Sequence, residues 1–298
     1  MSTHVHAPAP LSPNRGSRLL DPFTQQRVDP SLLVDGKELP TGPGEAPIAH
    51  GGSSHIKALH DLYRVFASIL RYHRLAARCA AGQGGDLPLE DLQGFISAWA
   101  REALPLLRLE VERVGSIAPL QEPTLFVGNH LSYLDIPVLM SQVPVVFLGK
   151  AEIAKWPILG PAARLAGMVF VQRDSDGSRR AASRAVLECL QTQGMSLGLF
   201  PSGTTTLDEG RPWRTGAFRI AKAGQVPVQP FRLAYAPREQ AAFLGRDALL
   251  PHLFRLLRSG PITTRIEFGE PRLVADPQTA AQECWAWSRA SASHLIPG

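Results

Sequence analysis

The chain has 298 residues and is 44% hydrophobic, which suits one large α/β domain with appendages and excludes several independent enzymes. Its formal net charge of +5 suits anionic membranes, nucleic acids or anionic substrates, and does not by itself choose among them. Cys79, Cys189 and Cys284 are far apart and show no metal-type pairing. Because three cysteines cannot all be bridged, we expect buried free thiols in a reducing cytoplasmic setting.

The first 55 residues are rich in Pro, Gly and Ser, with turn pairs such as Gly42-Pro43 and Gly51-Gly52. A segment of this composition cannot bury enough apolar surface to fold, so we expect a disordered leader over residues 1–55. The sequence contains no secretory signal pattern and no run of about 18 apolar residues, the length that a membrane-spanning helix needs. The expected membrane contact is therefore peripheral.

A helix is predicted over residues 56–81, with two sets of side chains at helical spacing. The apolar set is Leu59, Leu62, Phe66, Ile69 and Leu70. The cationic set repeats every seventh residue, at Lys57, Arg64, Arg71 and Arg78. Each cation near an anionic leaflet contributes about 1 kcal/mol, so this pattern favours binding to a membrane surface. Packing of the same helix on the protein core is the alternative.

A second helix is predicted over residues 88–107, and Pro105 should bend or end it. Its apolar side carries Leu89, Leu92, Phe95, Ile96 and Trp99. Residues 56–108 are thus interpreted as an amphipathic two-helix segment on the membrane surface, in front of a catalytic domain over residues 109–298.

From residue 109 the chain alternates short β-branched runs with helical runs, without an internal repeat. Strands are predicted at residues 109–114, 125–127, 143–148, 168–172, 196–200, 226–233 and 264–268. Helices are predicted near residues 135–142, 152–166, 178–193 and 216–224. This order indicates an α/β domain with a mixed, mostly parallel sheet covered by helices. Beyond about residue 237 the sequence adds little, and Trp285 and Trp287 are interpreted as packing or interfacial aromatics.

The most informative segment, Gly128-Asn129-His130-Leu131-Ser132-Tyr133-Leu134-Asp135, follows an apolar strand and opens a helix. Asp135 comes five residues after His130, about one turn into that helix. Its carboxylate can therefore hold one imidazole nitrogen of His130 and strengthen the other nitrogen as a base. The alternative is a histidine at a strand end with an aspartate that merely caps the next helix.

The pattern Asn129-His130-x4-Asp135 resembles the first signature (HX4D) of the glycerolipid acyltransferases, the PlsC-like family of 1-acylglycerol-3-phosphate acyltransferases. The resemblance implies that His130 and Asp135 are catalytic and that Asn129 belongs to the substrate site.

A second block is similar to the family in its order: Lys150 after a strand, then Gly160 and Gly167, then a strand that ends at Arg173. In the family this arginine helps to bind the phosphate of the acceptor. The resemblance therefore implies that Lys150 and Arg173 bind the acceptor, whereas Arg173 alone would be interpreted as a surface residue closing a strand.

The third block runs from Leu199 to Thr206 and is similar to the family signature Phe-Pro-Glu-Gly-Thr-Arg, except at its two charged positions. Ser202 stands in place of Glu and Thr205 in place of Arg, and some relatives that act on acceptors without phosphate are similar in carrying Thr there. A Pro-Ser-Gly-Thr turn offers backbone N–H groups and hydroxyls to an anion or an oxyanion. Ser202, Gly203, Thr204 and Thr205 are therefore predicted to bind substrate, and the backbone of Gly203 and Thr204 to bind the oxyanion.

A fourth block, residues 226–231, resembles the apolar Val-Pro-x-x-Pro strand of the family, which is thought to line the acyl pocket. An ordinary buried strand bounded by prolines explains the same residues almost as well.

The resemblance implies an O-acyltransferase that moves a fatty acyl group from acyl-CoA or acyl-ACP to the hydroxyl of a lysophospholipid-type acceptor. The acceptor stays open between 1-acylglycerol-3-phosphate and a lyso-aminolipid such as lyso-ornithine lipid. No metal and no permanently bound cofactor is expected. The expected partners are an anionic membrane surface on the cytoplasmic face, the lipid acceptor and, for an acyl-ACP donor, the acyl carrier protein. Nucleic acid is not expected, because basic residues are not interleaved with aromatics in a recognisable module.

Two other hypotheses compete with acyl transfer. Ser202 could be the nucleophile of a Ser-His-Asp lipid hydrolase, but Phe200 and Thr204 occupy the glycine positions of the Gly-x-Ser-x-Gly pattern. The altered third block could instead mark a catalytically lapsed protein that only binds membranes. The presence of both His130 and Asp135 argues against that second alternative.

Overall fold

The structure is a computed structural model that describes residues 55–290, except residues 86, 120–121, 157–158, 166–167, 172–175, 208–209 and 246. The predicted leader, residues 1–55, therefore lies outside the described residues apart from His55, the first residue of α1.

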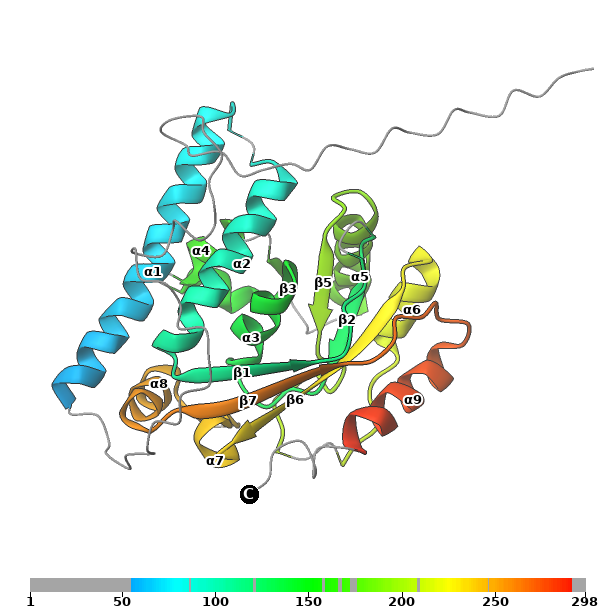
Figure 1. Ribbon diagram of the computed structural model, residues 1–298. Coiled ribbons are helices and arrows are strands. Elements are labelled where there is room, and N and C mark those ends of the chain that lie inside the picture. The colour runs from blue at the N-terminus through cyan, green and yellow to red at the C-terminus, as the bar shows by residue number, and fades with distance from the viewer. Residues whose placement is uncertain are drawn as a thin grey trace, which may run out of the picture.

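A seven-stranded sheet in the order β1-β7-β6-β2-β5-β3-β4 forms the centre of the molecule (Figure 1). Its strands are β1 (Leu109–Val114), β2 (Leu125–Gly128), β3 (Val145–Lys150), β4 (Val169–Val171), β5 (Ser196–Leu199), β6 (Val228–Ala236) and β7 (Ile262–Phe268). The five strands from β6 to β4 pair in parallel, whereas β7 is antiparallel to β6 and parallel to β1. The predicted mixed, mostly parallel sheet is confirmed.

Two groups of helices lie on either side of the central strands (Figure 1). The first group is α1 (His55–Gly82), α2 (Leu89–Leu106), α3 (Asp135–Gln142), α4 (Leu159–Leu165) and α8 (Leu249–Arg258). The second group is α5 (Asp176–Gln191), α6 (Gly216–Gly224) and α9 (Pro277–Arg289), and the short α7 (Arg238–Ala241) follows β6. Helices α7, α8 and α9 were not predicted, although α9 has a clear start signal: Asp276 accepts a hydrogen bond from Thr279 N (2.8 Å) before Pro277.

Prolines account for two differences from the predicted elements. The helix predicted over residues 152–166 is a 3₁₀ turn (Ala151–Lys155) followed by α4, because Pro157 disfavours the helical conformation of the residue before it. The strand predicted over residues 143–148 begins at Val145, because Pro144 has no N–H to donate to a neighbouring strand.

The two N-terminal helices share the core of the sheet domain. Ala58, Val65 and Ile69 of α1 are buried in the same hydrophobic cluster as β2 and α3, and α2 contacts both α3 and β1. The apolar face predicted for α1 divides in two, since Ile69 is 7% exposed whereas Leu59 is 57% exposed. No helix in the described part of the chain is both long enough and apolar enough to cross a membrane.

The three cysteines are buried and free, as predicted. Trp287 lies under the guanidinium of Arg232 at 4.3 Å, which agrees with a packing role.

A close approach between β2 and β6 depends on Gly128, which is paired with Phe231. A Cβ atom built on Gly128 would lie 2.4 Å from Cε2 of the Phe231 ring. The missing side chain thus makes room for a fully buried aromatic ring directly before Asn129 and His130.

We predict that Gly128→Ala lowers the free energy of unfolding by about 1–3 kcal/mol, because the added methyl group overlaps the Phe231 ring. Urea denaturation followed by tryptophan fluorescence measures the loss. Gly260→Ala is the matched control, since a Cβ there meets nothing within 4 Å. Equal stability of the two variants would contradict the proposed tight contact.

Candidate active site

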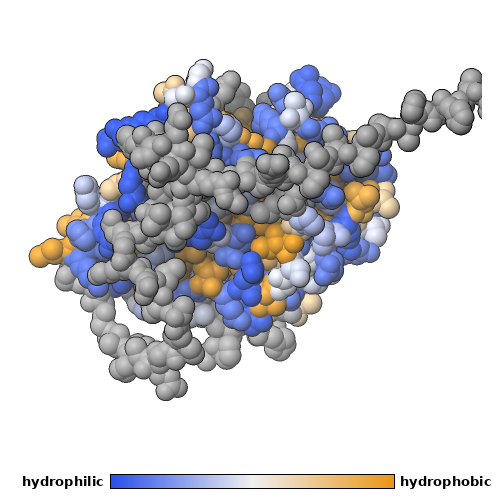
Figure 2. Space-filling model, turned by 45° about the horizontal axis from the view of Figure 1, so that its top comes forward, coloured by the Kyte–Doolittle hydropathy of each residue, from blue (hydrophilic) through white to orange (hydrophobic). Residues whose placement is uncertain are grey.

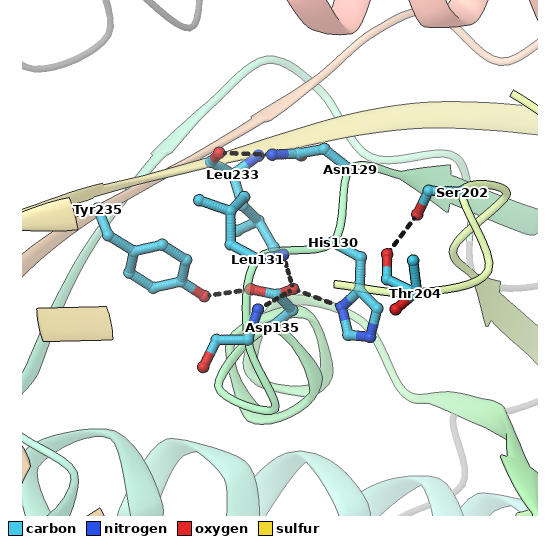
Figure 3. A network of polar contacts seen from close by, with 9 residues as sticks. Asn129, His130, Leu131, Asp135, Ser202, Thr204, Leu233 and Tyr235 are labelled. Atoms are coloured by element: carbon cyan, nitrogen blue, oxygen red, sulfur yellow. Dashed lines mark hydrogen bonds and ion pairs between the residues drawn. The ribbon is translucent and has the colours of Figure 1, made fainter. Parts of the chain in front are cut away.

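His130 follows β2 and Asp135 begins α3, and their side chains are in contact (Figure 3). His130 Nδ1 lies 2.7 Å from Asp135 Oδ2. Because an ionised carboxylate can only accept, Nδ1 carries the hydrogen and the lone pair lies on Nε2. Among the described residues none forms a hydrogen bond with Nε2, and the side chain of His130 is 19% exposed. The histidine therefore offers one basic nitrogen to a bound molecule.

The side chain of Asp135 is completely buried, and its carboxylate accepts hydrogen bonds from donors other than His130 as well. Its Oδ2 also accepts hydrogen bonds from the backbone N–H groups of Leu131 (2.8 Å) and Ser132 (3.0 Å). These bonds close the turn between β2 and α3, whereas α3 itself has no side-chain cap hydrogen bond at its N-terminus. Of the two alternatives offered by the sequence, the geometry of this carboxylate matches orientation of the histidine and not capping of the helix.

Tyr235 of β6 supplies the donor for the other carboxylate oxygen. Its hydroxyl donates to Asp135 Oδ1 at 2.7 Å (Figure 3). Burial, together with the adjacent charge of Asp135, raises the pKa of Tyr235 well above its ordinary value. The hydroxyl therefore stays protonated and remains a donor. Sequence reasoning missed this residue; the available signal was a tyrosine in an apolar strand, since a buried hydroxyl needs a partner.

Asn129 joins the end of β2 to β6. Its Nδ2 donates to Leu233 O (2.8 Å), and its Oδ1 accepts from Leu233 N (2.7 Å). The side chain thus continues the pairing of the two strands beyond Gly128. This is a positioning contact, and it differs from the substrate contact expected from the sequence.

The third motif forms a turn beside His130. Gly203 N donates to Phe200 O (3.0 Å), and Gly203 has a positive φ of 78°, a conformation that favours glycine. The Phe200 ring stacks on the His130 ring at 3.9 Å between centroids, and Thr206 N donates to His130 O (2.8 Å). The turn is therefore attached to the histidine through both its ring and its backbone.

The backbone N–H groups that this turn can offer to an oxyanion are only partly those expected from the sequence. The Gly203 amide already donates to Phe200 O, so it is not the oxyanion donor that the sequence suggested. Within the described residues, the amides of Thr204 and Thr205 have no hydrogen-bond partner. Ser202 Oγ donates to Thr204 O at 2.9 Å.

Two predicted substrate residues are described little or not at all. Lys150 is the last residue of β3 and pairs with Val171 of β4, so its backbone lies at the same sheet edge as the end of β4. Arg173 lies outside the described residues. Within the described part of the chain, no group of His, Cys, Asp and Glu side chains is arranged to hold a metal ion.

A second network attaches the segment after β6 to the turn between His130 and Asp135. His252 of α8 donates through Nε2 to Ala242 O (2.8 Å), and its Nδ1 accepts from the Tyr133 hydroxyl (3.1 Å). Burial lowers the pKa of His252, in agreement with a neutral ring in these two bonds. Phe243 N donates to Leu131 O (3.0 Å). The four-residue connection between His130 and Asp135 is thereby bonded to α8 and to the segment after β6.

Comparison with known proteins gives the family. The sequence model described as Acyltransferase matches residues 108–234. A lyso-ornithine lipid O-acyltransferase of Pseudomonas aeruginosa is 40% identical over 178 residues, covering 58% of this chain and 67% of that protein. This chain belongs to the acyltransferase family. A 1-acyl-sn-glycerol-3-phosphate acyltransferase of Neisseria gonorrhoeae is 32% identical over 180 residues, covering 58% of this chain and 69% of that protein.

A solved structure shares the fold of this acyltransferase. The 1-acyl-sn-glycerophosphate acyltransferase PlsC of Thermotoga maritima matches with a TM-score of 0.58 at 19% identity, covering 81% of this chain and 94% of that chain. The family and the fold expected from the sequence motifs are confirmed, and the protein is an O-acyltransferase.

We predict that Tyr235→Phe lowers the kcat of this acyltransferase about tenfold and changes the KM of either substrate little. The lost hydrogen bond to a charged group is worth about 1.5–3 kcal/mol, and it holds Asp135 rather than a substrate. Steady-state kinetics with each substrate varied in turn measure the effect.

Tyr133→Phe is the matched control for this variant, because it also removes a hydrogen-bonded tyrosine hydroxyl, from a half-buried residue that bonds to His252 rather than to Asp135. The control should lower Tm and leave kcat nearly unchanged. If the two variants lose kcat to a similar extent for a similar loss of Tm, Tyr235 only stabilises the fold.

Proposed function

We propose that this acyltransferase moves a fatty acyl group from a thioester donor, acyl-CoA or acyl-ACP, to the hydroxyl of a lysophospholipid-type acceptor, with lyso-ornithine lipid preferred. The observation that carries the proposal is the bond between His130 Nδ1 and Asp135 Oδ2, which directs the lone pair of Nε2 away from the carboxylate. The site thereby contains an oriented base beside a turn with unused backbone donors.

The proposed reaction starts when His130 Nε2 takes the proton of the acceptor hydroxyl. The hydroxyl oxygen then forms a bond to the thioester carbonyl carbon, and Asp135 stabilises the imidazolium. The amides of Thr204 and Thr205 are suited to bind the oxyanion of the tetrahedral intermediate. The C–S bond breaks as the intermediate collapses, and the thiolate takes the proton from His130. The step needs neither a covalent acyl-enzyme nor a metal.

The preference for lyso-ornithine lipid has two supports. Ser202 and Thr205 are neutral where the family signature has charged residues, so these two positions of the turn offer no positive charge to a phosphate group. The relative that is 40% identical is named for lyso-ornithine lipid, whereas the one named for 1-acyl-sn-glycerol-3-phosphate is 32% identical.

The geometry of Ser202 argues against a serine hydrolase. In that mechanism the serine hydroxyl donates to the basic nitrogen of the histidine. Here Ser202 Oγ donates to Thr204 O, within its own turn (Figure 3).

We further propose that the acyltransferase lies on an anionic membrane through the outer face of α1. Ile56, Leu59 and Tyr63 share this face and are 81%, 57% and 70% exposed, and Leu250 of the adjacent α8 is 55% exposed. Figure 2 shows exposed hydrophobic side chains at the left-hand tip, where Figure 1 places the start of α1. Four cations of α1 are exposed, at Lys57, Arg64, Arg71 and Arg78. Apolar residues bordered by cations are typical of an interfacial helix.

The proposed reaction is tested with labelled acyl-CoA and acyl-ACP and a panel of lyso-ornithine lipid, lysophosphatidate and other lysophospholipids. We expect product from lyso-ornithine lipid with the wild-type protein. His130→Ala should lower kcat/KM by about 10²–10⁴-fold, the usual contribution of a general base, and Asp135→Asn should lower kcat more than it raises the acceptor KM. Absence of product from every acceptor and both donors would favour the catalytically lapsed alternative.

The membrane proposal is tested with the triple variant Ile56→Ser, Leu59→Ser, Tyr63→Ser. Its partitioning onto vesicles with anionic lipid should fall at least about tenfold, since inserting one such side chain contributes about 1.5–3 kcal/mol. Leu273→Ser, which changes a leucine that is 68% exposed after β7, is the matched control and should bind like the wild type. Unchanged binding of the triple variant in sedimentation assays would refute this face of α1 as the contact.

A further inference from the structure

Arg214 lies against the turn of the third motif. A Cβ atom built on Gly203 would lie 3.2 Å from Nη1 and 3.3 Å from Cζ of Arg214, so the guanidinium lies directly over the Gly203 Cα. The backbone N–H of Arg214 donates to Pro201 O (3.2 Å). This second contact fixes the base of the side chain to the same turn.

The guanidinium of Arg214 is available to a ligand. The residue is exposed, and among the described residues no carboxylate lies within ion-pair distance of it. Some other arginines of the described residues are bonded to acidic partners, as Arg232 is to Glu267 and Arg108 to Asp61. An arginine without such a partner, beside a turn with unused amides, is suited to bind an anion.

The position of Arg214 is close to the reacting groups. The turn that it covers begins with Phe200, whose ring stacks on the histidine at 3.9 Å between centroids, and continues to Thr206, whose N–H donates to His130 O (2.8 Å). An anionic group held by Arg214 would therefore lie beside the turn that contacts His130.

We propose that Arg214 is the specificity-determining cation of the acceptor site and binds the anionic headgroup of the lipid acceptor. This inference rests on the proposed acyl transfer and deepens it. Ser202 and Thr205 bring no charge to the turn, and Arg214 supplies a positive charge to the same turn from the segment just before α6. In lyso-ornithine lipid the anion is the ornithine carboxylate, whose two oxygens match the paired donors of a guanidinium. In lysophosphatidate the same chemistry would hold the phosphate.

The test compares lyso-ornithine lipid with its carboxyl methyl ester, which keeps the acceptor hydroxyl and removes the negative charge. The wild-type protein should prefer the acid over the ester by about tenfold or more in kcat/KM, the effect of a hydrogen bond to a charged group. Arg214→Ala should abolish this preference by losing activity on the acid alone, and Arg214→Lys should retain part of it. The KM for the acyl donor should stay unchanged.

Arg113→Ala on β1 is the matched control, because it removes an exposed arginine from the far edge of the sheet. It should retain the full preference, which separates a local contact from a change in overall charge. Thermal unfolding of Arg214→Ala and Arg214→Gln checks that the fold is intact, as expected for an exposed side chain. If Arg214→Ala keeps the wild-type ratio of acid to ester, the inference is overturned.

Binding without turnover separates this inference from the proposed function. Calorimetry on His130→Ala and on the double variant His130→Ala, Arg214→Ala measures affinity for the acid and the ester in micelles. Loss of the preference for the acid in the double variant supports the role of Arg214 even if the wild-type protein transfers no acyl group. Equal preference in both proteins refutes it. A third outcome is that the charge of the headgroup matters for lysophosphatidate and not for lyso-ornithine lipid. If Arg214→Ala abolishes that dependence on charge, Arg214 has the proposed role with phosphate as the anion.

Discussion

The buried carboxylate of Asp135 joins the elements on which the site depends. It accepts one bond from His130, two from the backbone between β2 and α3, and one from Tyr235 of β6. An unpaired charge in the interior would be strongly destabilising, so these donors stabilise the fold as well as orient the histidine. The stability of the turn and the direction of the base are therefore properties of the same set of bonds.

Strand β6 provides the support for that carboxylate. Phe231, Leu233 and Tyr235 follow one another at every second position, as residues on one side of a strand do. Their contacts reach successive parts of the first motif: Phe231 lies over Gly128, Leu233 binds the Asn129 amide, and Tyr235 binds Asp135. The parallel pairing of β2 with β6 brings these two stretches together, although they are about a hundred residues apart in the sequence.

The site uses the carboxyl ends of neighbouring parallel strands. His130 follows β2, and the turn of Phe200 and Gly203 follows β5, which pairs directly with β2. Such an edge is where open α/β sheets bind their ligands, because the strands end there and their backbone groups are free. Stacking on the Phe200 ring also limits rotation of the His130 imidazole about its side-chain bonds. A base held by a carboxylate on one nitrogen and by an aromatic face along its ring is organised before substrate arrives.

The sequence by itself determined the parts of this protein that depend on local pattern. The alternation of apolar and helical runs located all seven strands and the helices up to residue 224, because these periodicities are local properties of the chain. The five-residue spacing of His130 and Asp135 predicted their contact, although the turn between β2 and α3, rather than a turn of helix, brings the carboxylate back toward the ring. Tertiary structure alone decided which groups are already used: Tyr235 joins Asp135 across β6, the amide of Asn129 is taken by Leu233, and the N–H of Gly203 by Phe200. No local pattern in the sequence marks Arg214 as a site residue, because its proposed role depends on the proximity of its guanidinium to Gly203. Proximity between segments comes from tertiary structure rather than from local pattern.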